Sequence, residues 1–403
     1  MRGDGGVRGW LQAWARPRSG GARRVAPLAA VALLTLGVLA GCGGNQPYST
    51  IAPQTSKADD IQFLYAMTFW LALVVFIAVQ AAIVYTVIRF RRKDDHLPVQ
   101  VHGSKRLEMA WTIAPAVVLL LVFIPTAQVI YKHANAVESA NFRVDVVGKQ
   151  WWWEISYPDI PANEADAAAG PLITANEVIL PLGADVVFDL QTNNVIHSFW
   201  VPQLSGKLDL IPGHENLMEF KATTLGDFYG ECAEYCGASH AWMRFKVKVV
   251  PQADFDAWVK AWRTPPAFDA NPETPGVAEA PKSFGVCLAC HNINGTNAKI
   301  AKTGLTSNPY GIGAGPNLTL LGCRDTIAAG LLVNTEANVE TWLKHTDEVK
   351  AGVYMPNYYK QGEIDDAKVA ELAKYLESLK PAGGCPAAQP VGGVIAPAAT
   401  PVP

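Results

Sequence analysis

The residues best suited to bind a transition metal occur in one short run and at one earlier position. Cys232, Cys236 and His240 are four residues apart in turn, Met243 follows three residues later, and His197 lies upstream. Thiolate, imidazole and thioether groups form a soft donor set, which favours copper over magnesium, calcium or manganese. A single tight loop can therefore present four side chains to one site, with His197 as a fifth donor.

Three other interpretations of the same residues remain open. Cys232 and Cys236 can form a disulfide if the segment lies outside the cytoplasm. Two cysteines and two histidines can also hold a structural zinc ion, although zinc gives Met243 no role. The His and Met residues can also simply be buried in the loop.

A second redox motif follows about fifty residues later. Cys287-Leu288-Ala289-Cys290-His291 has the C-x-x-C-H spacing of covalent c-type haem attachment, with His291 as an iron ligand. A thioredoxin-like dithiol is the alternative, but no βαβ pattern surrounds the motif; an incidental match is another. Met355 is the only methionine after Met243, and we expect it to be the second axial ligand. A haem with His and Met ligands favours electron transfer over oxygen chemistry.

Two apolar stretches are long enough to carry these motifs on a membrane anchor. Residues 61–88 and 109–131 contain no charged side chain, and each exceeds the ~20 residues that span a bilayer. The short connection between them is rich in Arg and Lys, so the positive-inside rule predicts a helical hairpin with both outer ends outside the cytoplasm.

The N-terminus resembles a bacterial lipoprotein signal. Arg23 and Arg24 precede an apolar run that ends in Leu39-Ala40-Gly41-Cys42. The sequence predicts a signal peptide over 1–41 and lipidation of Cys42. A signal with an incidental cysteine, or a short additional helix, is the alternative.

Short β-type runs follow the second apolar stretch. Val144 and Val146 alternate with polar residues, and three further runs occur at 178–180, 186–190 and 245–249. This pattern predicts a Greek-key barrel or sandwich over 140–252. Gln150 precedes three consecutive tryptophans, Trp151 to Trp153. Because successive side chains of a strand point to opposite faces, we expect at least one tryptophan to be exposed.

The C-terminal part is predicted to be a separate helical unit. A Pro-rich stretch over 253–281 reads as a linker, residues 282–385 as the haem domain, and residues 386–403 as a disordered tail. A helix over 365–379 places four apolar residues on one stripe: Val369, Leu372, Leu376 and Leu379. Cys323 and Cys385 remain without another role, and a disulfide between them is plausible outside the cytoplasm.

Composition argues against a nucleic-acid partner. Half of the 403 residues are apolar, and the formal net charge is −3. The first 41 residues contribute +5, which leaves about −8 on the remainder. A moderately acidic mature chain is compatible with a basic protein partner.

Several motifs together resemble the family of cytochrome c oxidase subunit II. Val195 to Pro202 (VIHSFWVP) and Gly230 to Met243 (GECAEYCGASHAWM) match its signature for the binuclear copper centre, CuA. The resemblance covers roughly residues 60–250, while the M-P-x-Y turn at Met355 and the helix after it resemble a class I cytochrome c. Asn194, where the family commonly has Asp, is one departure and puts the tuning of the copper site in doubt.

The resemblance implies specific roles for the residues. Both cysteines would bridge two copper ions, and the remaining ligands would be His197, His240, Met243 and the backbone carbonyl of Glu234. The Glu234 carboxylate would also bind a magnesium ion at the boundary with subunit I. Trp151 matches the tryptophan that receives electrons above the copper centre. Glu108, in Glu108-Met109-Ala110-Trp111-Thr112, matches the glutamate at the mouth of a proton path into subunit I.

These observations predict a multidomain membrane protein with a two-helix transmembrane hairpin over 61–132, an all-β cupredoxin domain and an all-α class I cytochrome c domain. The resemblance implies an electron-transfer subunit of a proton-translocating cytochrome c oxidase in a bacterial cell membrane, with both soluble domains outside. Its partners would be subunit I, subunit III and an external donor, either cytochrome c or a quinol:cytochrome c reductase complex. A membrane-anchored copper-delivery or redox-sensor protein is the alternative; a quinol oxidase subunit normally lacks these copper ligands, and nitrous oxide reductase lacks the hairpin.

Overall fold

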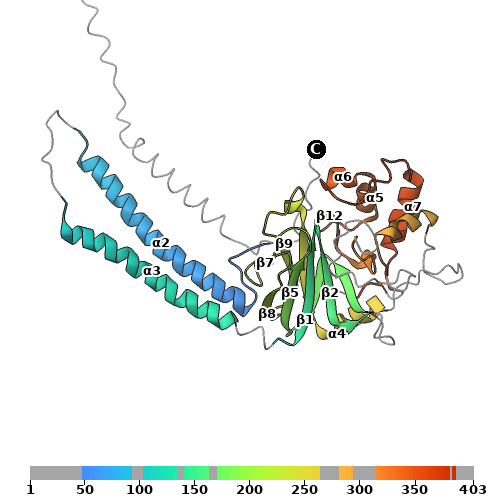
Figure 1. The fold of residues 1–403 in the computed structure, drawn as a ribbon, viewed down its shortest axis with the longest axis horizontal. Helices are drawn as coiled ribbons and strands as arrows, with labels where there is room; N and C mark the ends of the chain where they lie inside the picture. Colours follow the sequence, from blue (N-terminus) through green and yellow to red (C-terminus); the bar gives the residue numbers. More distant parts are fainter. Residues whose placement is uncertain are drawn as a thin grey trace, which may run out of the picture. The chain divides into compact units, whose positions relative to one another are not determined.

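The computed structural model describes residues 48–92, 103–134, 140–162, 170–263, 281–293, 315–381 and 384–386. The predicted signal peptide over 1–41 and the lipidation of Cys42 lie outside these residues, as do positions 387–403 of the predicted tail. Within the described part, the three predicted architectures are present: an apolar helical hairpin, an all-β domain and a helical C-terminal domain (Figure 1).

Two long helices form the hairpin (Figure 1). Helix α2 covers Ser56–Arg89 and helix α3 covers Lys105–Ala134, so both exceed the length that spans a bilayer. The Thr55 side chain caps α2 by accepting a hydrogen bond from the Ala58 amide. Nearly all apolar side chains of both helices are exposed in the chain alone, as expected of lipid-facing helices.

The β domain is built from two five-stranded sheets. The first has the strand order β3-β2-β1-β5-β8, and the second has the order β4-β10-β9-β6-β7. The strands of the first sheet are β1 (Phe142–Lys149), β2 (Trp152–Pro161), β3 (Pro171–Ala175), β5 (Asp185–Thr192) and β8 (Asn216–Lys221). Those of the second are β4 (Glu177–Pro181), β6 (His197–Trp200), β7 (Leu208–Leu210), β9 (Gly226–Cys232) and β10 (Arg244–Val250).

An aromatic core between the sheets fixes the position of the metal-binding loop. Trp153, Phe199 and Phe245 are at most 2% exposed, and the Phe199 and Phe245 rings stack with centroids 4.4 Å apart. Gly230 makes this packing fit, because a β-carbon there would lie 2.2 Å from the Phe245 ring. Strands β9 and β10, which flank the loop, are thereby held against one core.

A polar clamp fastens the outer ends of the helices to the β domain. The His133 ring lies between two carboxylates, with Nε2 2.8 Å from Asp60 and Nδ1 3.1 Å from Glu219. Lys57 of α2 also binds Glu219, which belongs to β8, at 3.2 Å. Because these side chains are largely shielded from water, the clamp limits movement between hairpin and sheet.

The predicted exposure of a tryptophan in the Trp151–Trp153 run is wrong. Trp153 faces the aromatic core, as alternation requires, but Trp151 and Trp152 are only 6% and 9% exposed. Both are covered by the C-terminal domain: Tyr354 stacks on Trp151, and Ala329 packs against Trp152. The alternation rule failed because it considers one sheet alone, whereas a second domain covers the other face.

The predicted linker begins too early. Residues Gln252–Arg263 form helix α4, whose Phe255, Val259 and Trp262 are buried against the β domain. These three residues recur at the spacing of one helix face, a signal present in the sequence. The β domain therefore extends through α4.

The C-terminal domain consists mainly of short helices (Figure 1). Its elements are the 3-10 helices η4 (Lys282–Ala289) and η5 (Leu321–Cys323), the small strands β11 (Thr326–Ile327) and β12 (Leu332–Val333), and helices α5 (Glu336–Lys344), α6 (Thr346–Val349) and α7 (Asp366–Glu377). The predicted apolar stripe of α7 is buried in the core of this domain. Cys323 and Cys385 form a disulfide, which ties the end of the domain to η5.

An ionic cluster joins the C-terminal domain to the β domain. Asp325 lies 2.8 Å from Lys246 and 2.7 Å from Lys248, both on β10, and its amide donates to Glu177. Lys246 and Lys248 are at most 8% exposed. Burial opposes ionisation of Asp325, but the ammonium groups of Lys248 and Lys246 outweigh it and lower the pKa of this carboxyl below its usual value.

Asp325→Asn is expected to destabilise the full chain by about 1 kcal/mol near neutral pH, because two buried ammonium groups lose their nearest carboxylate. Each keeps a second, more distant one: Asp227 lies 3.7 Å from Lys246, and Glu177 lies 4.0 Å from Lys248. The pKa of Asp325 is lower in the folded chain than in the unfolded chain. The stabilisation by Asp325 is therefore complete above its unfolded pKa of about 4, and it is lost as the pH falls through its pKa in the folded chain. Thermal unfolding of variant and wild type should therefore converge below about pH 4. Asp159→Asn, at an exposed position of β2, is the matched control. An Asp325→Asn difference that does not depend on pH would contradict this account.

Candidate metal centre and haem cavity

The predicted copper ligands come from four adjacent pieces of the second sheet. His197 is the first residue of β6, and Cys232 is the last residue of β9. The chain then turns through Cys236 into the 3-10 helix η3 (His240–Trp242), and Met243 immediately precedes β10. Strand β6 pairs with β9, and β9 pairs with β10. The neighbouring strand ends, with the loop between β9 and β10, therefore bring all five residues together at one end of the sheet.

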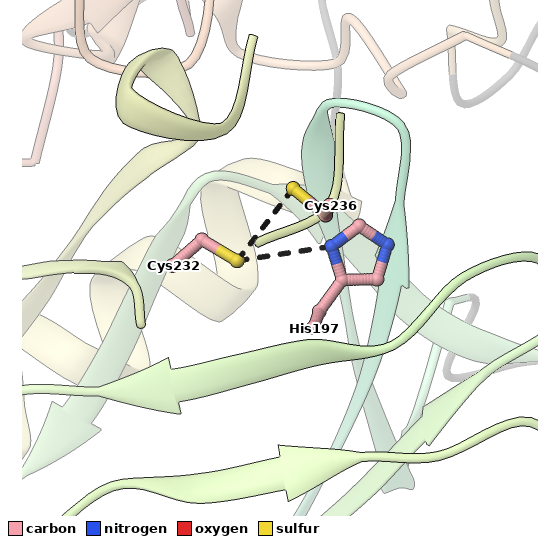
Figure 2. Close-up of side chains that lie close together, drawn as sticks. All are labelled: His197, Cys232 and Cys236. Atoms are coloured by element: carbon pink, nitrogen blue, oxygen red, sulfur yellow. Dashed lines mark hydrogen bonds between the residues drawn. The ribbon is translucent and has the colours of Figure 1, made fainter. Parts of the chain in front are cut away.

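The donor atoms of these residues converge on the two thiols. Figure 2 shows His197, Cys232 and Cys236 pointing toward one another. The two sulfurs lie 3.8 Å apart. Cys232 Sγ lies 3.8 Å from His197 Nδ1 and 3.2 Å from the Glu234 carbonyl oxygen. Cys236 Sγ lies 3.7 Å from His240 Nδ1 and 4.0 Å from Met243 Sδ. Cys232 and Cys236 are free thiols. Two thiol sulfurs, two ring nitrogens, a thioether and a carbonyl oxygen thus lie around the Cys232–Cys236 pair, which is a donor set suited to copper. His197, Cys232, Cys236 and Met243 are buried, whereas His240 is only partly buried.

The two thiols shift each other's ionisation in opposite directions. The contact with Cys236, together with the His197 ring, lowers the pKa of Cys232 to about 3 despite burial. The same contact and burial raise the pKa of Cys236 well above its usual value. A bound metal would hold both residues as thiolates, because thiolates rather than thiols are metal ligands.

The orientation of the His197 ring is set by its second nitrogen. Nδ1 faces Cys232, while Nε2 lies 3.3 Å from the Asn194 side-chain oxygen. With Nδ1 free to bind metal, Nε2 carries the proton and donates to Asn194. Asn194 therefore supplies a neutral hydrogen-bond acceptor for the His197 ring.

Trp151 holds the loop through the backbone of Cys236 and Gly237. Its indole N–H donates to the Cys236 carbonyl at 3.0 Å, and the Gln150 side-chain amide donates to the same oxygen at 2.7 Å. Gly237 follows with φ +116°, and a β-carbon there would lie 3.0 Å from the Trp151 ring. A residue other than glycine would therefore separate the loop from Trp151.

A large cavity in the C-terminal domain carries the haem motif. It encloses about 1320 Å³, including the part open to solvent, and its lining includes Cys287, Cys290, His291, Met355, Trp342 and Trp151. The two thiols are free, and the turn between them is closed by the His291 amide donating to the Cys287 carbonyl at 2.9 Å. The sequence thus brings both attachment thiols and both predicted axial ligands to one mostly apolar cavity, as a covalently bound haem requires.

His291 is prepared to bind iron through one nitrogen. Its Nδ1–H donates to the Pro316 carbonyl at 2.8 Å, which leaves Nε2 as the free ligand atom. Burial lowers the pKa of His291, so the ring stays neutral. Gly315 permits the close approach, because a β-carbon there would lie 2.7 Å from the ring.

One predicted residue lies apart from both sites. Glu108 is exposed in the first turn of α3, and its role in a proton path stays a prediction. The Glu234 carbonyl joins the copper ligands, but nothing in the structure tests a magnesium ion at its carboxylate.

Sequence reasoning missed Lys350 and Tyr354, which contact Trp151 from the C-terminal domain. No local motif marks them, since their positions depend on how the domains pack.

Comparison with known proteins agrees with this arrangement. Three family models match: "Cytochrome C oxidase subunit II, transmembrane domain" over residues 51–129, "Cytochrome C oxidase subunit II, periplasmic domain" over 142–250 and "Cytochrome c" over 277–380. Cytochrome c oxidase subunit 2 of Alkalihalophilus pseudofirmus is 33% identical, over 89% of this chain and 97% of the relative. That of Bacillus sp. strain PS3 is 36% identical, over 85% and 94%. A solved structure, the periplasmic domain of subunit II of cytochrome oxidase from Bradyrhizobium japonicum, is 32% identical over 30% of this chain and 92% of that one, with a TM-score of 0.27.

Proposed function

The chain belongs to the family of cytochrome c oxidase subunit II, in the form that carries a C-terminal cytochrome c domain, and we propose that it passes electrons between its two redox sites. Electrons from an external donor enter at the cytochrome c domain, move to the copper loop of the β domain and leave for subunit I. Oxygen reduction and proton translocation take place in subunit I. Copper and haem would supply the one-electron chemistry, and the chain's own residues hold, orient and shield them.

The residue roles in this proposal follow the donor geometry. Cys232, Cys236, His197, His240, Met243 and the Glu234 carbonyl would hold two copper ions. Cys287 and Cys290 would attach the haem, and His291 and Met355 would bind its iron. Burial of His197, Cys232, Cys236 and Met243 limits the access of water to the site. The aromatic core fixes the strand ends beside these residues, which would keep structural change during electron transfer small.

The observation that carries the proposal is the position of Trp151. One edge of its indole ring binds the Cys236 carbonyl of the copper loop, and the ring also lines the cavity that contains His291 and Met355. Trp151 is only 6% exposed, so an external protein cannot dock directly on it. A donor must instead deliver its electron to the cytochrome c domain, which is why the fused domain is the first stop.

Several finer assignments in the proposal come from sequence motifs and from the family resemblance rather than from geometry. Glu108 marks the mouth of a proton path, the Glu234 carboxylate binds magnesium at the boundary with subunit I, and Cys42 is lipidated. Both soluble domains lie on the outer side of a bacterial cell membrane, and subunit III completes the complex. The domains comprise a signal peptide over 1–41, the hairpin, a β domain extended through α4, a linker after Arg263, and the cytochrome c domain to Cys385. A copper-delivery or sensor role is disfavoured, since it requires neither the haem domain nor the hairpin.

The order of oxidation tests the proposed path. When the fully reduced oxidase complex is mixed with oxygen, the copper absorbance is expected to change before the haem c absorbance, because copper lies nearer to subunit I in the path. Stopped-flow or flow-flash spectroscopy of the complex follows both. Oxidation of haem c while copper stays reduced would contradict the path.

A further inference from the structure

One six-residue segment of the cytochrome c domain contacts the face of the β domain that carries Trp151. This segment, Lys350–Met355, follows helix α6 and ends at the predicted axial ligand. We call it the docking strap. Its position makes it part of both sites at once, because Val353, Tyr354 and Met355 line the haem cavity together with Trp151.

The first half of the docking strap is bound to the copper loop and to the backbone beside it. The Lys350 ammonium donates to the Trp151 carbonyl at 2.6 Å and to the Ala328 carbonyl at 3.1 Å, and thus bridges the two domains. The Ser239 hydroxyl, next to the predicted ligand His240, donates to the Ala351 carbonyl at 2.6 Å. Burial lowers the pKa of Lys350 to about 7, and two carbonyl oxygens, one from each domain, accept hydrogen bonds from its side-chain nitrogen.

The second half of the docking strap lies on the Trp151 ring. Gly352 has φ +74°, and a β-carbon there would lie 3.1 Å from the indole. The Tyr354 ring stacks on Trp151, with centroids 6.0 Å apart and planes 7° from parallel, and its hydroxyl donates to Gln150 at 3.2 Å. Tyr354 is still 39% exposed, so its ring is held by the stack and this bond rather than by deep burial.

These contacts form a continuous series between the two redox sites. Met355 is covalently next to Tyr354, Tyr354 stacks on Trp151, and Trp151 donates to the Cys236 carbonyl. Electron transfer weakens steeply with distance and with gaps between packed groups, so a stacked and hydrogen-bonded connection is more effective than a solvent gap. Small lateral movements of the cytochrome c domain would break the stack first.

From this geometry we infer that the docking strap fixes the cytochrome c domain on the β domain, and that Tyr354 is the positioning residue that keeps the two redox sites in contact through Trp151. The docking role does not depend on the proposed function, because the docking itself involves no metal or haem. The role of Tyr354 in connecting the two redox sites does rest on the proposed function. Tyr354 is not a ligand; it acts through Trp151 and Met355.

Two substitutions at Tyr354 distinguish the effect of its ring from the effect of its hydroxyl. Tyr354→Leu removes the stack while keeping an apolar side chain, and Tyr354→Phe keeps the ring and removes the hydroxyl with its bond to Gln150. In the assembled oxidase, hydroxyl-radical footprinting with mass spectrometry measures the exposure of Trp151, and flash-induced reduction of haem c measures its electron transfer to copper.

Tyr354→Leu is expected to raise the oxidation of Trp151 and to slow the transfer, each by up to about tenfold, the loss that one aromatic pair can cause. Tyr354→Phe should stay within about twofold of wild type in both. The haem and copper spectra and potentials should be unchanged in both variants, which a merely local effect on Met355 would not allow.

Equal protection of Trp151 in wild type and Tyr354→Leu would overturn the inference, as would an equal loss in the Phe and Leu variants. Footprinting needs neither cofactor, so it decides the docking role even in a preparation without copper. Absence of the copper or haem spectrum from the wild-type chain would instead contradict the proposed function.

Discussion

Replacing Cys236 with serine is expected to abolish the paired copper centre and to slow electron transfer from haem c to subunit I by more than about 100-fold. Even partners that only orient a metal ligand are worth about 10–100-fold, and Cys236 would be shared by both metals. Its sulfur is the atom around which Cys232, His240 and Met243 gather, all within 4.0 Å. The near-infrared band of the copper thiolate centre and the flash-induced transfer rate measure the two effects.

Tyr235→Phe is the matched control for Cys236→Ser. Tyr235 lies in the same loop but is 75% exposed, so loss of its hydroxyl should leave the copper band and the rate unchanged. The haem c spectrum should be normal in both variants, because its ligands lie in the other domain. A Cys236→Ser chain that retains both the band and the rate would show that the thiol pair does not hold copper.

Replacing Met355 with alanine is expected to open one axial position of the haem iron and to lower its reduction potential by a few tenths of a volt, within the ~0.8 V range that axial ligands span. A thioether ligand raises the reduction potential of a haem, so loss of the Met355 thioether should lower it. The copper spectrum should not change, because no copper ligand is contributed by the cytochrome c domain. Carbon monoxide binding and a redox titration measure these effects.

Val286→Ala provides the comparison for Met355→Ala. Val286 also lines the haem cavity but is 44% exposed and carries no group that can bind iron. It should leave the iron six-coordinate and unable to bind carbon monoxide. If Met355→Ala behaves in the same way, another residue is the axial ligand.

The copper loop could be predicted from the sequence because most of its chemistry is local. Cys232, Cys236, His240 and Met243 occupy one run, and the β-hairpin formed by the flanking strands brings them together with little help from distant residues. His197 was found only by its motif, since the pairing of β6 with β9 joins positions far apart in the chain. The haem motif was equally local, and helix α7 was predicted from its apolar period.

The contacts between the domains could not be predicted in this way. Lys350, Tyr354 and Asp325 acquire their roles only when the cytochrome c domain packs on the β domain, and no periodicity or motif encodes that packing. The same packing buries Trp151 and Trp152, which strand alternation alone placed partly in solvent. Helix α4 is a different case. Its apolar spacing was visible in the sequence, but because of the prolines that follow Arg263 the predicted linker started too early and included the helix.

Metal and haem content of the purified wild-type protein tests the account most directly. Elemental analysis, together with the c-type haem and near-infrared spectra, should give two copper ions and one covalently bound haem for each chain. Zinc in place of copper, a single copper ion, or a Cys232–Cys236 disulfide found by mass spectrometry in the metal-loaded protein would contradict it.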